Sequence, residues 1–140
     1  FDDPANLFVA QFVGEPQINV LPGVARDADG RTTVEIGSGS GALDTAVTGV
    51  ADGTRVTVGI RPQDCALRTD TAAAGIHTTV AYFEHLLEFG LATSTVSGVE
   101  EGIVVQTPAA ENYEPEQKVV VTAPAERVYL FDSDSGERLR

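Results

Sequence analysis

One short stretch constrains the fold of this chain most, an alternating run that stops at a proline. Val56, Val58 and Ile60 alternate with polar or small residues, which is the two-residue period of a strand with one buried face. Pro62 lacks the amide hydrogen of a further ladder bond, and it forces the residue before it into an extended conformation. The predicted strand therefore ends with the guanidinium of Arg61 at its rim.

Two interpretations of Arg61 follow from its chemistry. A guanidinium offers five donors in a planar fork, which suits a carboxylate or a row of carbonyl oxygens. The first interpretation is structural, with Gly59, Ile60, Arg61 and Pro62 forming a corner in which the arginine ties two layers together. In the second interpretation Arg61 receives an anionic ligand or a partner protein.

Charge and composition exclude several classes of protein. The 140 residues include 9 basic and 21 acidic ones, and a net charge of −12 repels phosphate backbones, so we expect no nucleic-acid partner. A single cysteine, Cys65, excludes an internal disulfide, and with only two histidines no zinc pattern can be formed. The length suits one domain, or two very small ones that share a core.

The first residues have the pattern of a short helix. Asp3 can cap it, Pro4 suits its first turn, and Gly14 follows where a left-handed C-terminal cap belongs. We therefore predict a helix over 4–13. The chain begins at Phe1 and contains no methionine, and we expect it to be a piece of a longer polypeptide.

Strand patterns fill the remainder of the chain. A strand from residue 18 to 25, interrupted at Pro22-Gly23, is expected to form a hairpin with 32–36 across the turn Asp27-Ala28-Asp29-Gly30. Further strands are predicted over 42–47, 55–60, 76–83, 91–96, 103–107, 118–122 and 127–131, with a linker between two halves at 69–75. Many short strands with glycine- and proline-rich turns, after one N-terminal helix, indicate an all-β sandwich or small barrel, with spacing that fits a five-stranded barrel.

Catalytic constellations are missing from the sequence. Cys65 has no histidine placed by sequence to serve it, and His85 beside Glu84 fits a surface histidine. The loop Gly37-Ser38-Gly39-Ser40-Gly41 has the glycines of a phosphate-binding loop, but no Lys-Ser or Lys-Thr follows it. We therefore expect no catalytic, cofactor or metal site in this chain.

Four motifs, in order, resemble those of a known family. They are Pro4-Ala5-Asn6-Leu7-Phe8-Val9-Ala10-Gln11-Phe12-Val13-Gly14, Pro16-Gln17-Ile18-Asn19-Val20-Leu21-Pro22-Gly23, Gly59-Ile60-Arg61-Pro62, and Leu130-Phe131-Asp132 with Gly136 and Arg138. Together they resemble the segment that follows the nucleotide-binding domain in ATPase subunits of ABC importers for carbohydrates and glycerol 3-phosphate. Gln63 departs from that family's usual Glu, and 84–90 is longer than its usual bend.

The resemblance implies an accessory module, the TOBE domain with an OB-type barrel, which acts in dimerisation and regulation. It implies a helical junction over 1–14 from an ATPase domain, a β domain over 15–140, and structural or interaction roles for Asn19, Phe131 and Asp132. It also implies a second copy of the chain, the N-terminal ATPase domain and the transporter's membrane subunits as partners, at the cytoplasmic face of the membrane. ATP and magnesium would be bound by the parent protein, because this chain lacks the phosphate loop and has one lysine, Lys118.

Two other functions stay open on the residues alone. Related barrels can bind oxyanions or sugars between two halves or two subunits, and only the loop 37–41 and the linker 69–75 point to such a sensor, while the net charge of −12 opposes an anion. A stand-alone enzyme is disfavoured by the missing catalytic residues.

Overall fold

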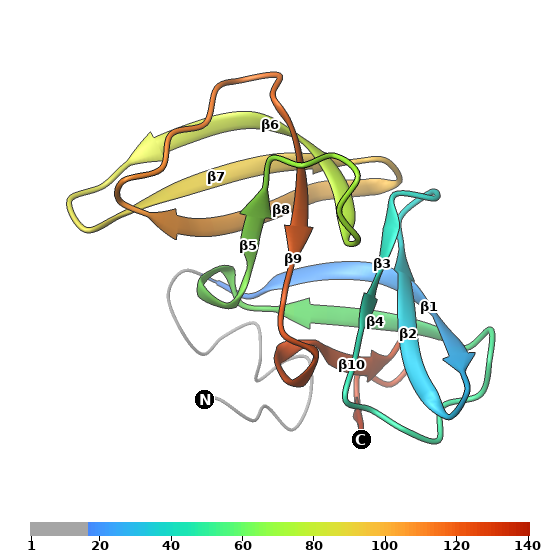
Figure 1. Cartoon of the computed structure of the whole chain (residues 1–140). Helices are drawn as coiled ribbons and strands as arrows, with labels where there is room; N and C mark the ends of the chain where they lie inside the picture. The colour runs from blue at the N-terminus through green and yellow to red at the C-terminus, as the bar shows by residue number, and fades with distance from the viewer. Residues whose placement is uncertain (1–16) are drawn as a thin grey trace.

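The protein is an all-β structure. A computed structural model describes residues 17–140, so the predicted helix 4–13, the whole predicted junction 1–14 and residues 15 and 16 of the predicted β domain lie outside the described residues. Within the described range there are eleven strands, two single-turn 3-10 helices and no α-helix (Figure 1). No helix in this range is long and apolar enough to span a membrane.

The elements follow one another closely along the chain. They are β1 (Asn19–Ala28), β2 (Arg31–Ile36), β3 (Gly41–Asp44), β4 (Arg55–Ile60), η1 (Pro62–Asp64), β5 (Ala66–Arg68), β6 (Ile76–His85), β7 (Phe89–Val96), β8 (Val99–Pro108), β9 (Lys118–Thr122), η2 (Ala125–Arg127), β10 (Tyr129–Asp132) and β11 (Arg138–Leu139).

The strands form two groups that share one hydrogen-bonded sheet. Their order is β11-β10-β4-β1-β2-β3-β6-β7-β8, with β9 paired to both β5 and β6, and all pairs are antiparallel. Figure 1 shows β1 to β4 and β10 together in one group and β5 to β9 in the other. We call these the first and second strand groups. The chain returns to the first group for its last two strands.

The hairpin of β1 and β2 confirms the predicted Asp-Gly turn. Asp29 and Gly30 have φ values of 54° and 89°, which are the left-handed conformations that a two-residue hairpin turn requires. The predicted interruption at Pro22-Gly23 is wrong, because β1 runs through both residues. Since β2 pairs with β1 only from Gly23 onward, Pro22 lies where one side of β1 has no partner strand, and there a missing amide hydrogen is tolerated.

Other predicted strands agree with the structure to different degrees. β4 and β9 have the predicted bounds, whereas β3 ends earlier than the predicted strand 42–47. The bend predicted over 84–90 is the end of a hairpin, in which the amide of Leu86 donates to the carbonyl of Phe89 at 2.8 Å. Residues 69–75 connect β5 to β6, and the division into two halves there stays a prediction.

Two clusters of buried apolar residues stabilise the strands. The larger one takes side chains from both strand groups, including Leu21, Val58, Ile76 and Ile103, each with no exposed surface. Because both groups contribute, burying this cluster holds the groups together. The smaller cluster consists of Ile18, Tyr129 and Phe131.

Backbone also joins the groups directly at the loop 37–41, which connects β2 to β3. The amide of Ser38 donates to the carbonyl of Ser97 at 2.9 Å, and the amide of His77 donates to the carbonyl of Ser40 at 2.7 Å. A Cβ added at Gly41 would lie 2.0 Å from the carbonyl oxygen of Gly75. The loop 37–41 is thus a hairpin turn whose glycines let two backbones meet.

Alanine substitutions at two glycines of this loop distinguish two effects on stability, the close approach of Gly41 to Gly75 and the strain of a side chain at positive φ. Gly41 and Gly39 both have positive φ, but a Cβ at Gly39 has no atom within 4 Å. We expect Gly41→Ala to lower the free energy of unfolding by about 2–4 kcal/mol and Gly39→Ala by about 1 kcal/mol. Urea unfolding monitored by circular dichroism measures both, and equal losses would contradict the close-approach explanation.

Candidate functional site

The predicted corner forms at the end of β4. Arg61 has the extended conformation expected before proline, with φ −74° and ψ 142°, and Pro62 opens η1. Only 2% of Arg61 is exposed, and it is among the largest fully buried side chains of the described residues. A cation buried to this degree needs its donors satisfied by the protein, which favours the structural interpretation over an open ligand site.

Asn19 lies beside the corner and joins the two strand groups. It pairs with Ile60 across β1 and β4, and its side chain is buried. Its Nδ2 donates to the carbonyl of Val104 on β8 at 2.8 Å, and the amide of Val104 donates to its Oδ1 at 2.8 Å. The side-chain amide thus acts as one rung of a ladder to β8, whose one partner strand within residues 17–140 is β7.

Cys65 is buried near the same corner. Burial raises the pKa of its thiol to about 12, with a further increase from the charge of Asp64, while a hydrogen bond with Asn19 opposes the shift. The thiol is therefore neutral at physiological pH and a poor nucleophile. The buried thiol therefore fills space near the corner. Among residues 17–140, no group of three or more His, Cys, Asp or Glu side chains could hold a metal ion.

Gly59 and Phe131 meet on the other side of β4. A Cβ at Gly59 would lie 3.0 Å from Phe131 and 3.1 Å from Ile18, so a side chain there would crowd the smaller cluster. Gly59 also pairs with Tyr129 across β4 and β10. The motif residues at the two ends of the chain's β region therefore pack against each other.

Asp132 shapes the turn between β10 and β11. Its carboxylate accepts from the amide of Asp134 at 2.9 Å and from the amide of Ser135 at 2.8 Å. These bonds to the charged form lower the pKa of Asp132. The turn returns Arg138 to the ring of Tyr129, with 4.6 Å between the guanidinium carbon and the ring centroid.

A groove of about 740 Å³ lies on the outer face of the first strand group, beside the loop 37–41. Glu35 and Arg55 are its charged residues, and glycines supply much of the rest. Its full lining is Pro22, Gly23, Val24, Glu35, Gly37, Ser38, Gly39, Gly41, Ala42, Arg55, Val56, Thr57, Gly98 and Ser133. Sequence reasoning identified the loop but not the strand residues that face it, because the pairing of β1 with β2 and β4 brings them together.

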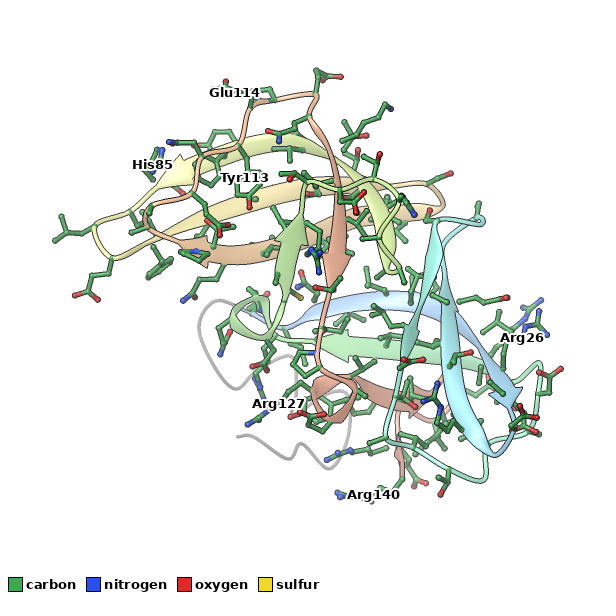
Figure 2. The ribbon with its side chains drawn as sticks, viewed as in Figure 1. Arg26, His85, Tyr113, Glu114, Arg127 and Arg140 are labelled. Carbon is green, nitrogen blue, oxygen red and sulfur yellow. The ribbon has the colours of Figure 1, made fainter. Side chains whose placement is uncertain are left out.

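The predicted residues thus form one cluster and one separate turn. Asn19, Ile60, Arg61 and Pro62 lie together, with Gly59 and Phe131 on the opposite side of β4, whereas Asp132 acts in the turn beyond β10. His85 lies elsewhere, where its Nε2 contacts Oδ1 of Asn112 at 2.5 Å. Figure 2 shows His85 with Tyr113 at one end of the molecule, away from Arg26. Nothing here forms a catalytic constellation among the described residues.

Removing the Asn19 amide tests its role as a rung. Asn19→Ala would leave an amide and a carbonyl of Val104 unpaired, and we expect the free energy of unfolding to fall by about 2–4 kcal/mol. The control Asn112→Ala changes an exposed asparagine and should cost less than about 0.5 kcal/mol. Equal effects in chemical denaturation would show that the contact with Val104 contributes little.

Removing the Arg61 guanidinium tests the corner. We expect Arg61→Ala to lower the free energy of unfolding by about 1–3 kcal/mol, because the groups that face a buried cation lose their partner. The control Arg68→Ala removes an exposed arginine of β5 and should change the free energy of unfolding by less than about 0.5 kcal/mol. Differential scanning calorimetry measures both variants, and an unchanged melting temperature for Arg61→Ala would contradict a structural role.

Known proteins resemble this chain in sequence and in fold. No protein-family model matches it. The alpha-glucoside transport ATP-binding protein of Rhizobium meliloti is 30% identical over 135 residues, 96% of this chain and 37% of that protein. An sn-glycerol-3-phosphate import ATP-binding protein of Ruegeria pomeroyi is 32% identical over 139 residues, 99% of this chain and 36% of that protein. The lactose transport ATP-binding protein of Rhizobium radiobacter is 30% identical over 147 residues, all of this chain and 39% of that protein.

In fold, the chain is similar to the cytoplasmic molybdate-binding protein ModG in a crystal form with molybdate bound. The TM-score is 0.60 at 20% identity, covering 80% of this chain and 94% of ModG. This likeness confirms the all-β, OB-type fold. The sequence relatives confirm the resemblance carried by the four motifs, although the chain spans little more than a third of their length. The chain is thus homologous to the ATP-binding proteins of ABC importers for sugars and glycerol 3-phosphate.

Proposed function

We propose that this chain is the TOBE-type accessory domain of an importer ATP-binding subunit, with a role in dimerisation and regulation. The observation that carries the proposal is the sequence relation to importer ATP-binding proteins over 96% to 100% of the chain. The sequence has no phosphate loop, so ATP and magnesium would bind to the part of such a protein outside this chain. The module would act at the cytoplasmic face of the membrane, through the importer complex.

The distribution of exposed apolar residues supports a role in protein contact. Among the described residues the large apolar side chains with high exposure are Tyr82, Leu86 and Leu87, at 59%, 39% and 98%. All three belong to the hairpin of β6 and β7. Apolar groups gathered on one projecting element are typical of a contact surface. A second copy of the chain, the ATPase domain or a membrane subunit are the partners that the proposed function implies.

A domain exchange tests this function directly. The Escherichia coli sn-glycerol-3-phosphate import ATP-binding protein is 30% identical to this chain over 139 residues. We expect the E. coli protein to keep its dimer and its uptake activity when this chain replaces the matched segment, and to lose both when that segment is deleted. Sedimentation velocity measures the dimer, and uptake of radiolabelled substrate in cells lacking the native subunit measures transport.

A variant of the exchanged protein tests whether the exposed apolar residues of the β6 and β7 hairpin form the contact surface. Leu87→Ser in the exchanged protein removes an almost fully exposed apolar group without disturbing the core. We expect weaker association of the subunit with its partners and unchanged stability of the domain. An exchanged protein that behaves like the deletion would refute the accessory role.

Ligand binding is a second candidate function, favoured by the groove beside the loop 37–41 and by the fold shared with a molybdate-binding protein. The lining holds one carboxylate, Glu35, and one guanidinium, Arg55, and the carboxylate is already paired with Arg26 at 3.1 Å. A lining with one charge of each sign and many backbone polar groups suits a neutral polyol such as a sugar. Calorimetry with a panel of sugars and oxyanions tests it, and binding tighter than about 1 mM would support a sensing role.

A further inference from the structure

A second, more polar pocket lies on the second strand group. It has a volume of about 480 Å³ and is lined by residues of β6, the end of β7, the start of β9 and the connection before β6. Its polar lining residues with side-chain donors on the outer face are Thr71, His77, Thr79, Thr95, Ser97 and Lys118. This pocket is distinct from the groove beside the loop 37–41.

Strand register places the central donors next to one another. Thr79 pairs with Lys118 on β9 and with Thr95 on β7, so three neighbouring strands present these side chains on the same face. Neighbouring strands lie about 4.8 Å apart, which sets the spacing of the row. His77 lies two residues before Thr79 and therefore shares that face. The hydroxyl of Thr95 donates a long hydrogen bond, of 3.4 Å, to the carbonyl of Thr79. This bond keeps the hydroxyl beside the side chains of Thr79 and Lys118.

The charge of this lining is opposite to that of the chain. The protein has 21 acidic residues, yet none lines the pocket, and its single lysine does. Asp70 and Glu116, which lie close in sequence to Thr71 and Lys118, are both outside the lining. An ammonium, an imidazole and several hydroxyls are the side-chain donors that recognise oxyanions.

Thr78 also lines the pocket, but its side chain lies on the opposite, buried face of β6, between His77 and Thr79. The donors that face the pocket are therefore those of its exposed and half-buried residues.

We propose that this pocket binds a phosphate group, free or on a small organic molecule. Lys118 supplies the charge, and Thr79, Thr95 and His77 supply directed donors around it. The pocket is larger than a bare tetrahedral anion needs, so an organic phosphate also fits. This inference is independent of the accessory role, because it needs only the described residues of this chain.

Titration of the ¹⁵N-labelled chain tests the proposal by NMR. Inorganic phosphate and glycerol 3-phosphate are the anionic probes, glycerol is the neutral probe, and sodium chloride at matched ionic strength controls for screening. We expect saturable shifts at 77–79, 95–97 and 118 with both phosphates and none with glycerol. A larger affinity for glycerol 3-phosphate than for phosphate would identify the organic phosphate as the ligand, and the reverse would identify the free anion.

Two charge-matched variants decide whether the site is specific. Lys118→Gln removes the exposed lysine of the pocket, and Arg31→Gln removes an exposed arginine of β2 that pairs with Asp44 at 3.5 Å. We expect Lys118→Gln to weaken phosphate binding by about tenfold and Arg31→Gln to leave it unchanged. Non-saturating shifts that sodium chloride reproduces, or equal losses in the two variants, would overturn the proposal.

Discussion

The pair of hydrogen bonds between Asn19 and Val104 is the constraint on which the arrangement of the two strand groups depends. The residues are 85 positions apart, and the amide satisfies a donor and an acceptor on β8 that no strand of the described part of the chain pairs. An aliphatic side chain at this position would leave both groups unsatisfied at a buried junction. Asn19 also contacts Cys65, so one side chain fixes β8, β1 and the segment after Arg61 relative to one another.

The opposite side of the junction is held mainly by backbone contacts. Ser97 accepts from the amide of Ser38 and, at 3.4 Å, from the hydroxyl of Ser40, while Gly41 packs on Gly75. Contacts of this kind have few rotatable groups, so they lose little side-chain entropy when they form. These contacts also fix the walls of both cavities. Ser97 lines the polar pocket, and its neighbour Gly98 lines the groove beside the loop 37–41.

Local signals explain which parts of the fold were predictable. The alternation of 55–60, the proline after Arg61 and the Asp-Gly turn act over a few residues, and each formed as expected. β5 and β11 were missed because three and two residues carry no periodicity, and pairing with β9 and β10 creates them. The rung from Asn19 to Val104 and the row of Lys118, Thr79 and Thr95 depend on register between distant segments, which no single stretch of sequence encodes.

The two proposed contacts lie on different parts of the hairpin of β6 and β7. Residues 76–79 of β6 pair with β9, and Val80 exchanges backbone bonds with the segment at 116–117, so this part is held on both sides. Beyond the register shift between Val80 and Tyr82, β7 is the one strand among the described residues that pairs with β6. The polar pocket therefore lies on the anchored part, and the exposed apolar residues lie on the part with one partner strand. Because a bulge separates the two parts, the end of the hairpin can adjust to a protein partner while the row of donors keeps its spacing.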